Sequence, residues 1–461
     1  MPETITTVNP ATGAPLAEYK AMTTAEIDHA LTAATEAQTA WAALSLDQRT
    51  NRILAVAQVL RERQGELADL AVAEMGKPRT EALAEIEKCA WVCDHVYRTS
   101  AEHLAHDRVD AAGSESWTAY LPLGVVLAIM PWNFPFWQVF RFAAPALAAG
   151  NGALLKHSPN VTGCALAAQE VFEEAGLPAG LFTTLLVAEP DVPEVVGNLI
   201  ADDRVAAVTL TGSNRAGAHV AAAAGKAVKK SVLELGGSDP FVVLDDADLD
   251  TVVPKAVASR FLNAGQSCLA AKRFLVHHSI ATEFARRFAD AVAGLRVGDP
   301  AADDTQIGPL ARADLAQALH GQVERSVAAG ATALTGGGPL GDRGDAWYAP
   351  TVLAGVTTDM PVMTEETFGP VAAVVAFDDD EDAARLANLT PYGLGASVWS
   401  RDKDRALRVG SRIQSGALFV NAVVASDPRL AFGGVKQSGY GRELGAAGAR
   451  EFTNIRTVVV G

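Results

Sequence analysis

Short apolar strands alternate with amphipathic helices along most of this chain, and this alternation constrains the fold more than any other feature of the sequence. Apolar runs typical of buried strands cover residues 153–156, 182–187 and 206–211. Helical periodicity covers residues 161–175 and 215–227. The alternation resumes in the second half of the chain, where strands are expected near Phe241, Arg273, Val371, Ala396 and Ala417. Because strands that alternate with helices through short loops form parallel, doubly wound sheets, the sequence predicts an α/β fold with two such units in tandem.

The N-terminal part of the chain has a different pattern, in which helices precede a strand ribbon. Three stretches rich in Ala, Leu and Glu, residues 24–41, 47–75 and 79–106, have helical periodicity. Residues 114–129 then change to a strand pattern. A short ribbon between helical segments has little core of its own, so we expect it to project toward a second subunit.

Length and charge limit the partners of this protein. The chain has 461 residues, which calls for two or three structural units, and a formal net charge of −16 at pH 7. Because it contains no basic run, we expect neither nucleic acid nor an anionic membrane as a partner. The longest apolar stretch, residues 121–132, contains Gly124 and Pro131 and is too short to span a membrane.

The cysteines indicate the compartment. Cys89, Cys93, Cys164 and Cys268 are scattered, and no histidine pair lies near them at zinc-binding spacing, so no metal site is predicted. Scarce cysteines in a long chain are typical of a reducing compartment. The N-terminus shows no secretory signal pattern. We therefore expect a cytoplasmic protein.

Cys268 is the candidate nucleophile. It ends a polar turn and is followed by the buried strand pattern of residues 272–277, which would hold it on a partly exposed loop. The alternative is a small buried core residue, which is the commoner fate of a free cysteine. Glu234 lies among apolar neighbours before two glycines, and desolvation would raise its pKa toward the range of a general base. Its alternative is a solvated acid at a strand end.

Two loops offer further chemistry. Residues 131–135, Pro-Trp-Asn-Phe-Pro, form a stiff loop that can hold the Asn133 amide as an oxyanion donor, although Asn is also an ordinary turn residue. Glycines at Gly212 and Gly217 lie between a strand and a helix, where backbone amides can bind a pyrophosphate. This spacing is neither the dinucleotide fingerprint nor a P-loop, so an ordinary βα turn stays open.

Seven segments taken together carry a resemblance to a known family. They are PWNFP at 131–135, TGS at 211–213, LELGG at 233–237, GQSC at 265–268, EETFGP at 365–370, PYGLGASVW at 391–399 and FGGVKQSGYGRE at 432–443. In this order they resemble the aldehyde dehydrogenase superfamily over essentially the whole chain. The sequence is most similar to the short bacterial NAD(P)-dependent succinate-semialdehyde dehydrogenases. In this context Cys268 is interpreted as a nucleophile.

The resemblance implies a three-part architecture. A cofactor-binding α/β domain would comprise residues 1–107 and 125–234, and a catalytic α/β domain residues 235–428. An oligomerisation ribbon with the C-terminal strand would comprise residues 108–124 and 440–461. A homodimer or a homotetramer is expected, and the sequence does not decide between them.

The resemblance also implies a mechanism. Cys268 attacks a small-molecule aldehyde, Asn133 and the Cys268 N–H hold the oxyanion, hydride passes to NAD(P), and Glu234 activates the water that hydrolyses the thioester. Lys156 would contact the adenosine ribose, Ser213 the pyrophosphate, and Glu366 and Phe368 the nicotinamide half. The complete cofactor set implied by the motifs is Trp132, Lys156, Ser158, Gly212, Ser213, Leu235, Glu366 and Phe368.

The residues after Lys156 bear on the choice of cofactor. NAD-preferring relatives carry a ribose-binding glutamate three residues beyond this lysine, and here that position is Pro159. Without this carboxylate, Lys156, His157 and Ser158 can donate to a 2′-phosphate. The sequence therefore predicts that NADP is accepted and preferred, with NAD as the alternative cofactor.

Arg141 and Ser426 are the candidate substrate-binding residues. Arg141 lies between two phenylalanines, where succinate-semialdehyde dehydrogenases carry an arginine for the distal carboxylate. Its alternative role is a structural ion pair with a helix carboxylate. Leu262 occupies a position where some relatives carry a second arginine, and this departure leaves uncharged aliphatic or aromatic aldehydes as alternative substrates. A thiol hydrolase and a catalytically silent structural relative are the rival readings from other functional classes.

Overall fold

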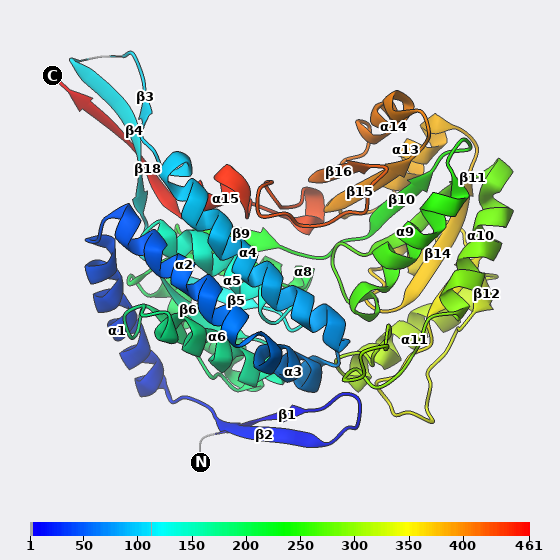
Figure 1. Ribbon diagram of the computed structural model, residues 1–461, viewed down its shortest axis with the longest axis horizontal. Helices are drawn as coiled ribbons and strands as arrows, with labels where there is room; N and C mark the ends of the chain where they lie inside the picture. Colours follow the sequence, from blue (N-terminus) through cyan, green and yellow to red (C-terminus); the bar gives the residue numbers. More distant parts are fainter. Residues whose placement is uncertain (1–2, 112) are drawn as a thin grey trace.

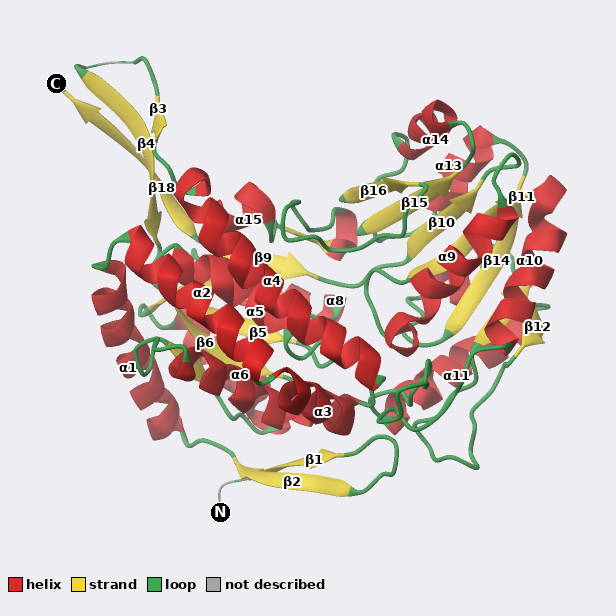
Figure 2. Cartoon of the chain, in the orientation of Figure 1, coloured by secondary structure: helices red, strands yellow, loops and turns green. Residues whose placement is uncertain are grey.

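The computed structural model describes residues 3–111 and 113–461, so residues 1–2 and 112 of the predicted terminal and ribbon segments lie outside it. Two sheet-containing halves lie side by side, and a thin ribbon projects from one of them (Figure 1). Helices cover both sheets, which gives the layered α/β architecture expected from the sequence (Figure 2). The predicted fold class is confirmed.

The first sheet has six strands in the order β17-β9-β8-β5-β6-β7, and only β17 is antiparallel to its neighbour. The strands are β5 (Val125–Met130), β6 (Gly152–His157), β7 (Phe182–Thr184), β8 (Val205–Thr211), β9 (Lys230–Glu234) and β17 (Gly439–Tyr440). The chain passes from β5 to β6 on one side and returns to β8 on the other. Such a reversal of strand order opens a crevice at the carboxyl ends of the strands, where nucleotides bind in doubly wound folds.

Both faces of this sheet are buried under helices. Val126 and Ala128 of β5 pack into one hydrophobic cluster, and Val125 and Leu127 pack into another on the opposite face. The first cluster involves α2 (Leu46–Glu62), α3 (Gln64–Met75), α4 (Arg79–His103), α5 (Trp137–Ala148) and α6 (Thr162–Glu174). The second involves α1 (Thr24–Ala42), α7 (Val192–Ala201) and α8 (Asn214–Lys226). Burial on both faces explains why these strands are continuous apolar runs in the sequence.

The second sheet has seven strands in the order β12-β13-β14-β11-β10-β15-β16, with only β12 antiparallel. The strands are β10 (Asp239–Val243), β11 (Ala271–His277), β12 (Thr332–Thr335), β13 (Thr351–Ala354), β14 (Val371–Phe377), β15 (Gly395–Trp399) and β16 (Ala417–Val420). The main helices of this half are α9 (Leu249–Phe261), α10 (His278–Ala293), α11 (Ala313–Ala328), α13 (Asp380–Asn388) and α14 (Lys403–Gly410). The segment from Glu234 to Asp239 leads directly from the end of β9 to the start of β10, and the chain returns to the first sheet between β16 and β17.

The projecting ribbon is a three-stranded sheet of β3 (Asp107–Arg108), β4 (Glu115–Pro122) and β18 (Thr453–Val460). β18 pairs with β4 along its whole length, yet Ile455 is 63% exposed and Val459 is 50% exposed. An edge strand with exposed β-branched residues is a surface suited to further pairing. A separate hairpin of β1 (Thr4–Val8) and β2 (Pro15–Lys20) packs near α3 and α6.

Three local expectations from the sequence differ from the structure. The helix predicted over residues 47–75 is two helices, α2 and α3, which meet at Arg63 just before the poor helix former Gly65. The strand predicted over residues 182–187 ends at Thr184. The third predicted helix ends at His103, three residues early. Among the described residues, no helix has the length and apolar character needed to cross a membrane.

Candidate active site

The predicted site residues gather where the two sheets meet. Trp132 and Asn133 follow β5, Ser213 follows β8, and Glu234 ends β9, all at the carboxyl edge of the first sheet. Cys268 precedes β11, at the amino edge of the second sheet. Glu366 and Phe368 precede β14 at the same edge. The fold thus brings together segments that lie more than two hundred residues apart in the sequence.

The turn before Cys268 has an unusual backbone. Asn263, Ala264 and Gly265 all have positive φ, at 53°, 51° and 74°. Left-handed conformations are unfavourable for non-glycine residues and persist only where the surroundings enforce them. Here the Asn263 N–H donates to Glu81 Oε2 at 2.7 Å, and its Nδ2 donates to the Asn133 carbonyl at 2.7 Å. These two contacts fix the turn that presents Cys268.

Asn133 is buried against the same turn. Its Nδ2 donates to the carbonyl of Gln266 at 3.1 Å, two residues before the cysteine. An amide nitrogen carries two hydrogens, so the second remains available for another acceptor. The position is compatible with the predicted oxyanion role, which stays a prediction.

Cys268 is partly exposed, whereas Cys89, Cys93 and Cys164 are buried. Burial of the thiol raises its pKa to about 11, while the positive charges of Arg141 and Lys272 act in the opposite direction. Lys272 Nζ donates to the carbonyls of Ser267 at 2.9 Å and Cys268 at 2.7 Å. A cation that both holds the loop and favours the thiolate is a positioning group for this nucleophile.

We expect Lys272→Met to raise the pKa of the Cys268 thiol further, because the substitution removes one of the two charges that lower it. Thiol alkylation by iodoacetamide increases with pH as the thiolate forms, so its rate profile should move to higher pH in the variant. Lys255→Met, at an exposed position on α9, is the matched control. Superimposable profiles for Lys272→Met and wild type would contradict this role.

Glu234 is buried in a group of charged side chains. Neither of its carboxylate oxygens has a hydrogen-bond partner among the described residues. Burial raises its pKa well above the ordinary value, and the neighbouring Glu443 adds to this increase, while Arg141 and Arg442 oppose it. A Cβ atom at Gly433 would lie 2.7 Å from Glu234 Oε1, so only glycine leaves room for this carboxylate. The site therefore holds a carboxyl group of raised proton affinity, as a general base requires.

Arg141 forms an ion pair with Glu443, and both side chains are almost completely buried. Arg141 Nη2 also donates to Thr211 Oγ1 at 3.3 Å, and the guanidinium lies 4.8 Å from the centre of the Phe432 ring. An ion pair, considered from the sequence as an alternative role for Arg141, is therefore present, but its partner Glu443 lies in a β-bridge with Phe432 and not in a helix as expected. The partner lies in the C-terminal segment and could not be identified from sequence alone.

The β8–α8 turn has the features of a pyrophosphate site. Ser213 is the N-cap of α8 and accepts a hydrogen bond from the Ala216 N–H at 3.3 Å. Gly217 in the first turn packs directly on Leu235, where a Cβ atom would lie 2.5 Å from Leu235 Cδ2. A helix N-terminus at the crevice between β8 and β5 favours a bound anion. These residues fit a dinucleotide.

Lys156, His157 and Ser158, at the end of β6, differ in their ability to donate to a ligand. Lys156 is buried, and desolvation lowers its pKa to about 8, with Glu189 acting against that decrease. His157 has both ring nitrogens engaged within the protein, because its Nε2 lies 2.9 Å from the Pro135 carbonyl and its Nδ1 accepts the Ser158 N–H at 2.8 Å. Burial lowers the pKa of His157 to about 4. The expectation that His157 donates to a 2′-phosphate is therefore wrong, and Lys156 and Ser158 remain as donors.

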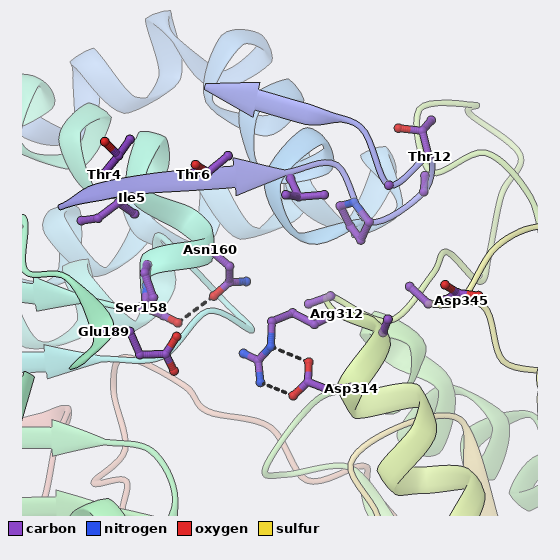
Figure 3. A pocket seen from close by; sticks show the side chains of 18 of the residues that line it. Thr4, Ile5, Thr6, Thr12, Ser158, Asn160, Glu189, Arg312, Asp314 and Asp345 are labelled. Atoms are coloured by element: carbon purple, nitrogen blue, oxygen red, sulfur yellow. Dashed lines mark hydrogen bonds and ion pairs between the residues drawn. The ribbon is translucent and has the colours of Figure 1, made fainter. Parts of the chain in front are cut away.

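Glu189 is a carboxylate that the sequence did not associate with this region. Figure 3 shows Glu189 beside Ser158 and Asn160 on one wall of a cavity of about 840 Å³, with Arg312 opposite and paired with Asp314. Ser158 Oγ donates to Asn160 Oδ1 at 2.7 Å. The space beside Ser158, where the sequence predicts the adenosine ribose, is therefore part of a larger cavity that Glu189 lines.

Glu366 and Phe368 join the two halves. Glu366 Oε1 accepts a hydrogen bond from the Gly237 N–H at 3.0 Å and lies 3.5 Å from Lys272 Nζ. The Phe368 ring meets the Trp132 ring edge to face, with 5.7 Å between centres. Predicted cofactor residues from opposite sheets thus contact each other or the nucleophile loop.

A second cavity, of about 320 Å³, is lined by the candidate nucleophile, Cys268. Its other walls include Arg141, Leu262 and Ser426. Lys88 of α4 also lines it, although no sequence pattern singled out this residue. Glu234 and Asn133 are not among its described lining residues. The cavity is a pocket of suitable size for a small ligand beside the thiol.

Comparison with known proteins agrees with this geometry. The sequence profile of the Aldehyde dehydrogenase family matches residues 1–458. The chain is 48% identical to the probable NADP(+) succinate-semialdehyde dehydrogenase of Synechocystis sp. over 98% of its length and 99% of the relative. It is 46% identical to the NAD(P)+ succinate semialdehyde dehydrogenase Sad of Escherichia coli K12, covering 98% and 96%. Succinic semialdehyde dehydrogenase from Streptococcus pyogenes, solved with NADP+, superimposes with a TM-score of 0.95 at 34% identity over 99% of each chain.

Proposed function

The chain belongs to the aldehyde dehydrogenase family, and from this premise we propose that it oxidises succinic semialdehyde to succinate with NADP as the preferred cofactor. The observation that carries the proposal is the cavity in which the Cys268 thiol shares its walls with two cations, Lys88 and Arg141, and with Ser426. A cation and a hydroxyl at this position provide donors for a carboxylate at the far end of a short aldehyde. The names of the relatives, which are succinate-semialdehyde dehydrogenases, support the same substrate.

In the proposed reaction the Cys268 thiolate attacks the aldehyde carbon and forms a thiohemiacetal. The Asn133 amide and the Cys268 N–H stabilise the oxyanion that develops on the former carbonyl oxygen. When NADP is bound, its nicotinamide ring accepts the hydride that leaves this carbon. Loss of hydride converts the thiohemiacetal into a succinyl thioester on Cys268.

Glu234 is proposed to complete the turnover. As a buried carboxylate it can take a proton from a water molecule, which then attacks the thioester carbonyl. Glu443 and Arg141 lie beside it and set its proton affinity in opposite directions. The products are succinate and the free thiol, so one aldehyde is oxidised for each NADP reduced.

The cofactor residues fit NADP. Ser213 and the start of α8 would hold the pyrophosphate, Lys156 and Ser158 the 2′-phosphate, and Glu366 and Phe368 the nicotinamide half. Pro159 occupies the position of the ribose-binding glutamate of NAD-preferring relatives, so that carboxylate is missing. Glu189, from another part of the chain, lies close enough to Lys156 to affect its pKa. We therefore propose a preference for NADP that Glu189 limits, with NAD still accepted.

Glu189→Gln is expected to increase kcat/KM for NADP by about 3- to 10-fold relative to NAD, because the substitution removes a negative charge near the 2′-phosphate at no change in size. Initial rates with each cofactor at saturating aldehyde measure the ratio. Glu194→Gln, an exposed acid on α7, is the matched control. A ratio that is the same in Glu189→Gln and wild type would exclude Glu189 as a determinant.

An aldehyde panel tests the proposed function. With NADP, kcat/KM for succinic semialdehyde should exceed that for butanal, which has the same chain length without the carboxylate, by about tenfold or more. Benzaldehyde should be a poorer substrate than succinic semialdehyde. A preference for butanal or benzaldehyde would instead favour the reading based on Leu262, in which uncharged aldehydes are the substrates.

We also propose how the protein assembles and where it is located. The exposed edge of β18 supports a homodimer or homotetramer in which the ribbon pairs with a second copy. Four cysteines, all free, support a reducing compartment, for which we propose the cytoplasm. Sedimentation of the purified protein distinguishes the two assemblies.

A further inference from the structure

Lys88 is a cation in the wall of the nucleophile cavity. It lies on α4, and its Nζ donates to Ser426 Oγ at 2.8 Å. The same ammonium lies 4.3 Å from the centre of the Trp137 ring. Ser426 is 8% exposed, so this ammonium–hydroxyl pair belongs to the interior of the pocket rather than to the outer surface.

The charge of Lys88 is not compensated by a carboxylate. Among the described residues, no carboxylate oxygen lies within the 4.0 Å of Nζ that defines an ion pair here. The acids that line the same cavity or act on Lys88 are engaged elsewhere. Glu81 accepts the Asn263 N–H at 2.7 Å, Glu85 pairs with Lys77 and accepts two backbone N–H groups, and Asp427 pairs with Arg429 at 2.6 Å. A partly desolvated ammonium without a counter-ion is unfavourable unless an anion completes its environment.

The other cation of the cavity differs in this respect. Arg141 is already paired with Glu443 and bonded to Thr211, so its charge is largely neutralised before any substrate arrives. Desolvation lowers the pKa of Lys88 to about 8, and the positive charge of Arg141 contributes to the decrease. An entering carboxylate would act in the opposite sense and stabilise the ammonium.

Leu262 lies in the same cavity and is 47% exposed. It offers no hydrogen-bond donor at the position where a second cation would otherwise reach the substrate. Lys88 enters from a different element, α4, and supplies a positive charge to the same space. The cavity thus contains two cations: Arg141, which is paired with Glu443, and Lys88, which has no carboxylate partner among the described residues.

We propose that Lys88, together with Ser426, binds the distal carboxylate of the substrate and is the main determinant of preference for a carboxylate-bearing aldehyde. This inference rests on the proposed function and names the residue that produces its selectivity. Arg141 then acts mainly through Glu443 and Glu234, as a positioning residue for the general base. Removal of the Lys88 charge should therefore reduce activity on the carboxylate-bearing aldehyde only, whereas removal of Arg141 should reduce activity on every aldehyde.

Lys88→Met is expected to lower kcat/KM for succinic semialdehyde by about 10- to 100-fold, the usual effect of losing a charge-assisted hydrogen bond. The value for butanal should stay within about threefold of wild type, because methionine preserves the length and packing of the side chain. Lys88→Arg should recover part of the lost selectivity, since it restores the charge. Arg141→Met should lower the rates with both aldehydes, because it leaves Glu443 unpaired beside Glu234.

The outcomes separate this inference from the proposed function. If wild type prefers succinic semialdehyde and Lys88→Met keeps that preference, Lys88 is not the determinant, although the proposed function stands. If wild type shows no preference, both ideas fail. An equal loss on both aldehydes in Lys88→Met would indicate a structural role and overturn the proposal, and circular dichroism with thermal unfolding would identify it.

Discussion

A Cys268→Ala variant is expected to lose oxidation of aldehydes by at least about a thousandfold, with no change in fold. The substitution removes the sulfur that would form both covalent intermediates, and no other cysteine is among the described lining residues of the cavity. Because the side chain is small and partly exposed, the free energy of unfolding should change by less than about 1 kcal/mol. Reduced nicotinamide formation and thermal unfolding measure the two effects.

The buried Cys93 provides a matched control. It lies fully inside the helical cluster of the first half, and no predicted site residue depends on it. Cys93→Ala should therefore lower the melting temperature and leave kcat within about threefold of wild type, because it removes core packing only. The opposite pattern, in which Cys268→Ala retains activity, would show that the nucleophile lies elsewhere.

Glu234→Gln should lower steady-state kcat by about two to three orders of magnitude while sparing the first turnover. Acylation of Cys268 and reduction of the cofactor do not require this carboxylate, so a stoichiometric burst of reduced nicotinamide should remain. Hydrolysis of the thioester does require it, because glutamine cannot accept a proton from water. Stopped-flow absorbance separates the burst from the slow phase that follows.

The same residue predicts a pH dependence. A general base works only when it is deprotonated, and burial together with Glu443 raises the pKa of Glu234. The rate of deacylation should therefore increase with pH up to that raised pKa, and the increase should disappear in Glu234→Gln. A burst of unchanged size with an unchanged steady-state rate in the variant would assign the base to another group.

The sequence predicted the parts of this protein that depend on local pattern. Continuous apolar runs such as residues 206–211 correspond to strands buried on both faces, and the strong periodicity of residues 24–41 corresponds to α1. The family and its fold followed from motifs in register, and both are confirmed. The break at Arg63 was missed because Gly65 alone is a weak signal within a long helical pattern.

What the sequence could not predict were partnerships between distant segments. Arg141 and Glu443 are three hundred residues apart, and nothing local to either indicates the other. Lys88 sits in an ordinary charged helix pattern, and its place beside Ser426 appears only once α4 is packed. The inward turn of His157 depends on the Pro135 carbonyl, which is a tertiary contact.

The most direct test of the account is the identification of the acyl group carried by Glu234→Gln after mixing with succinic semialdehyde and NADP. Mass spectrometry of the rapidly quenched protein should find one succinyl group, on the peptide that contains Cys268, and only when NADP is present. No adduct, an adduct on another residue, or a succinyl group that forms without nicotinamide cofactor would contradict the proposed nucleophile and reaction.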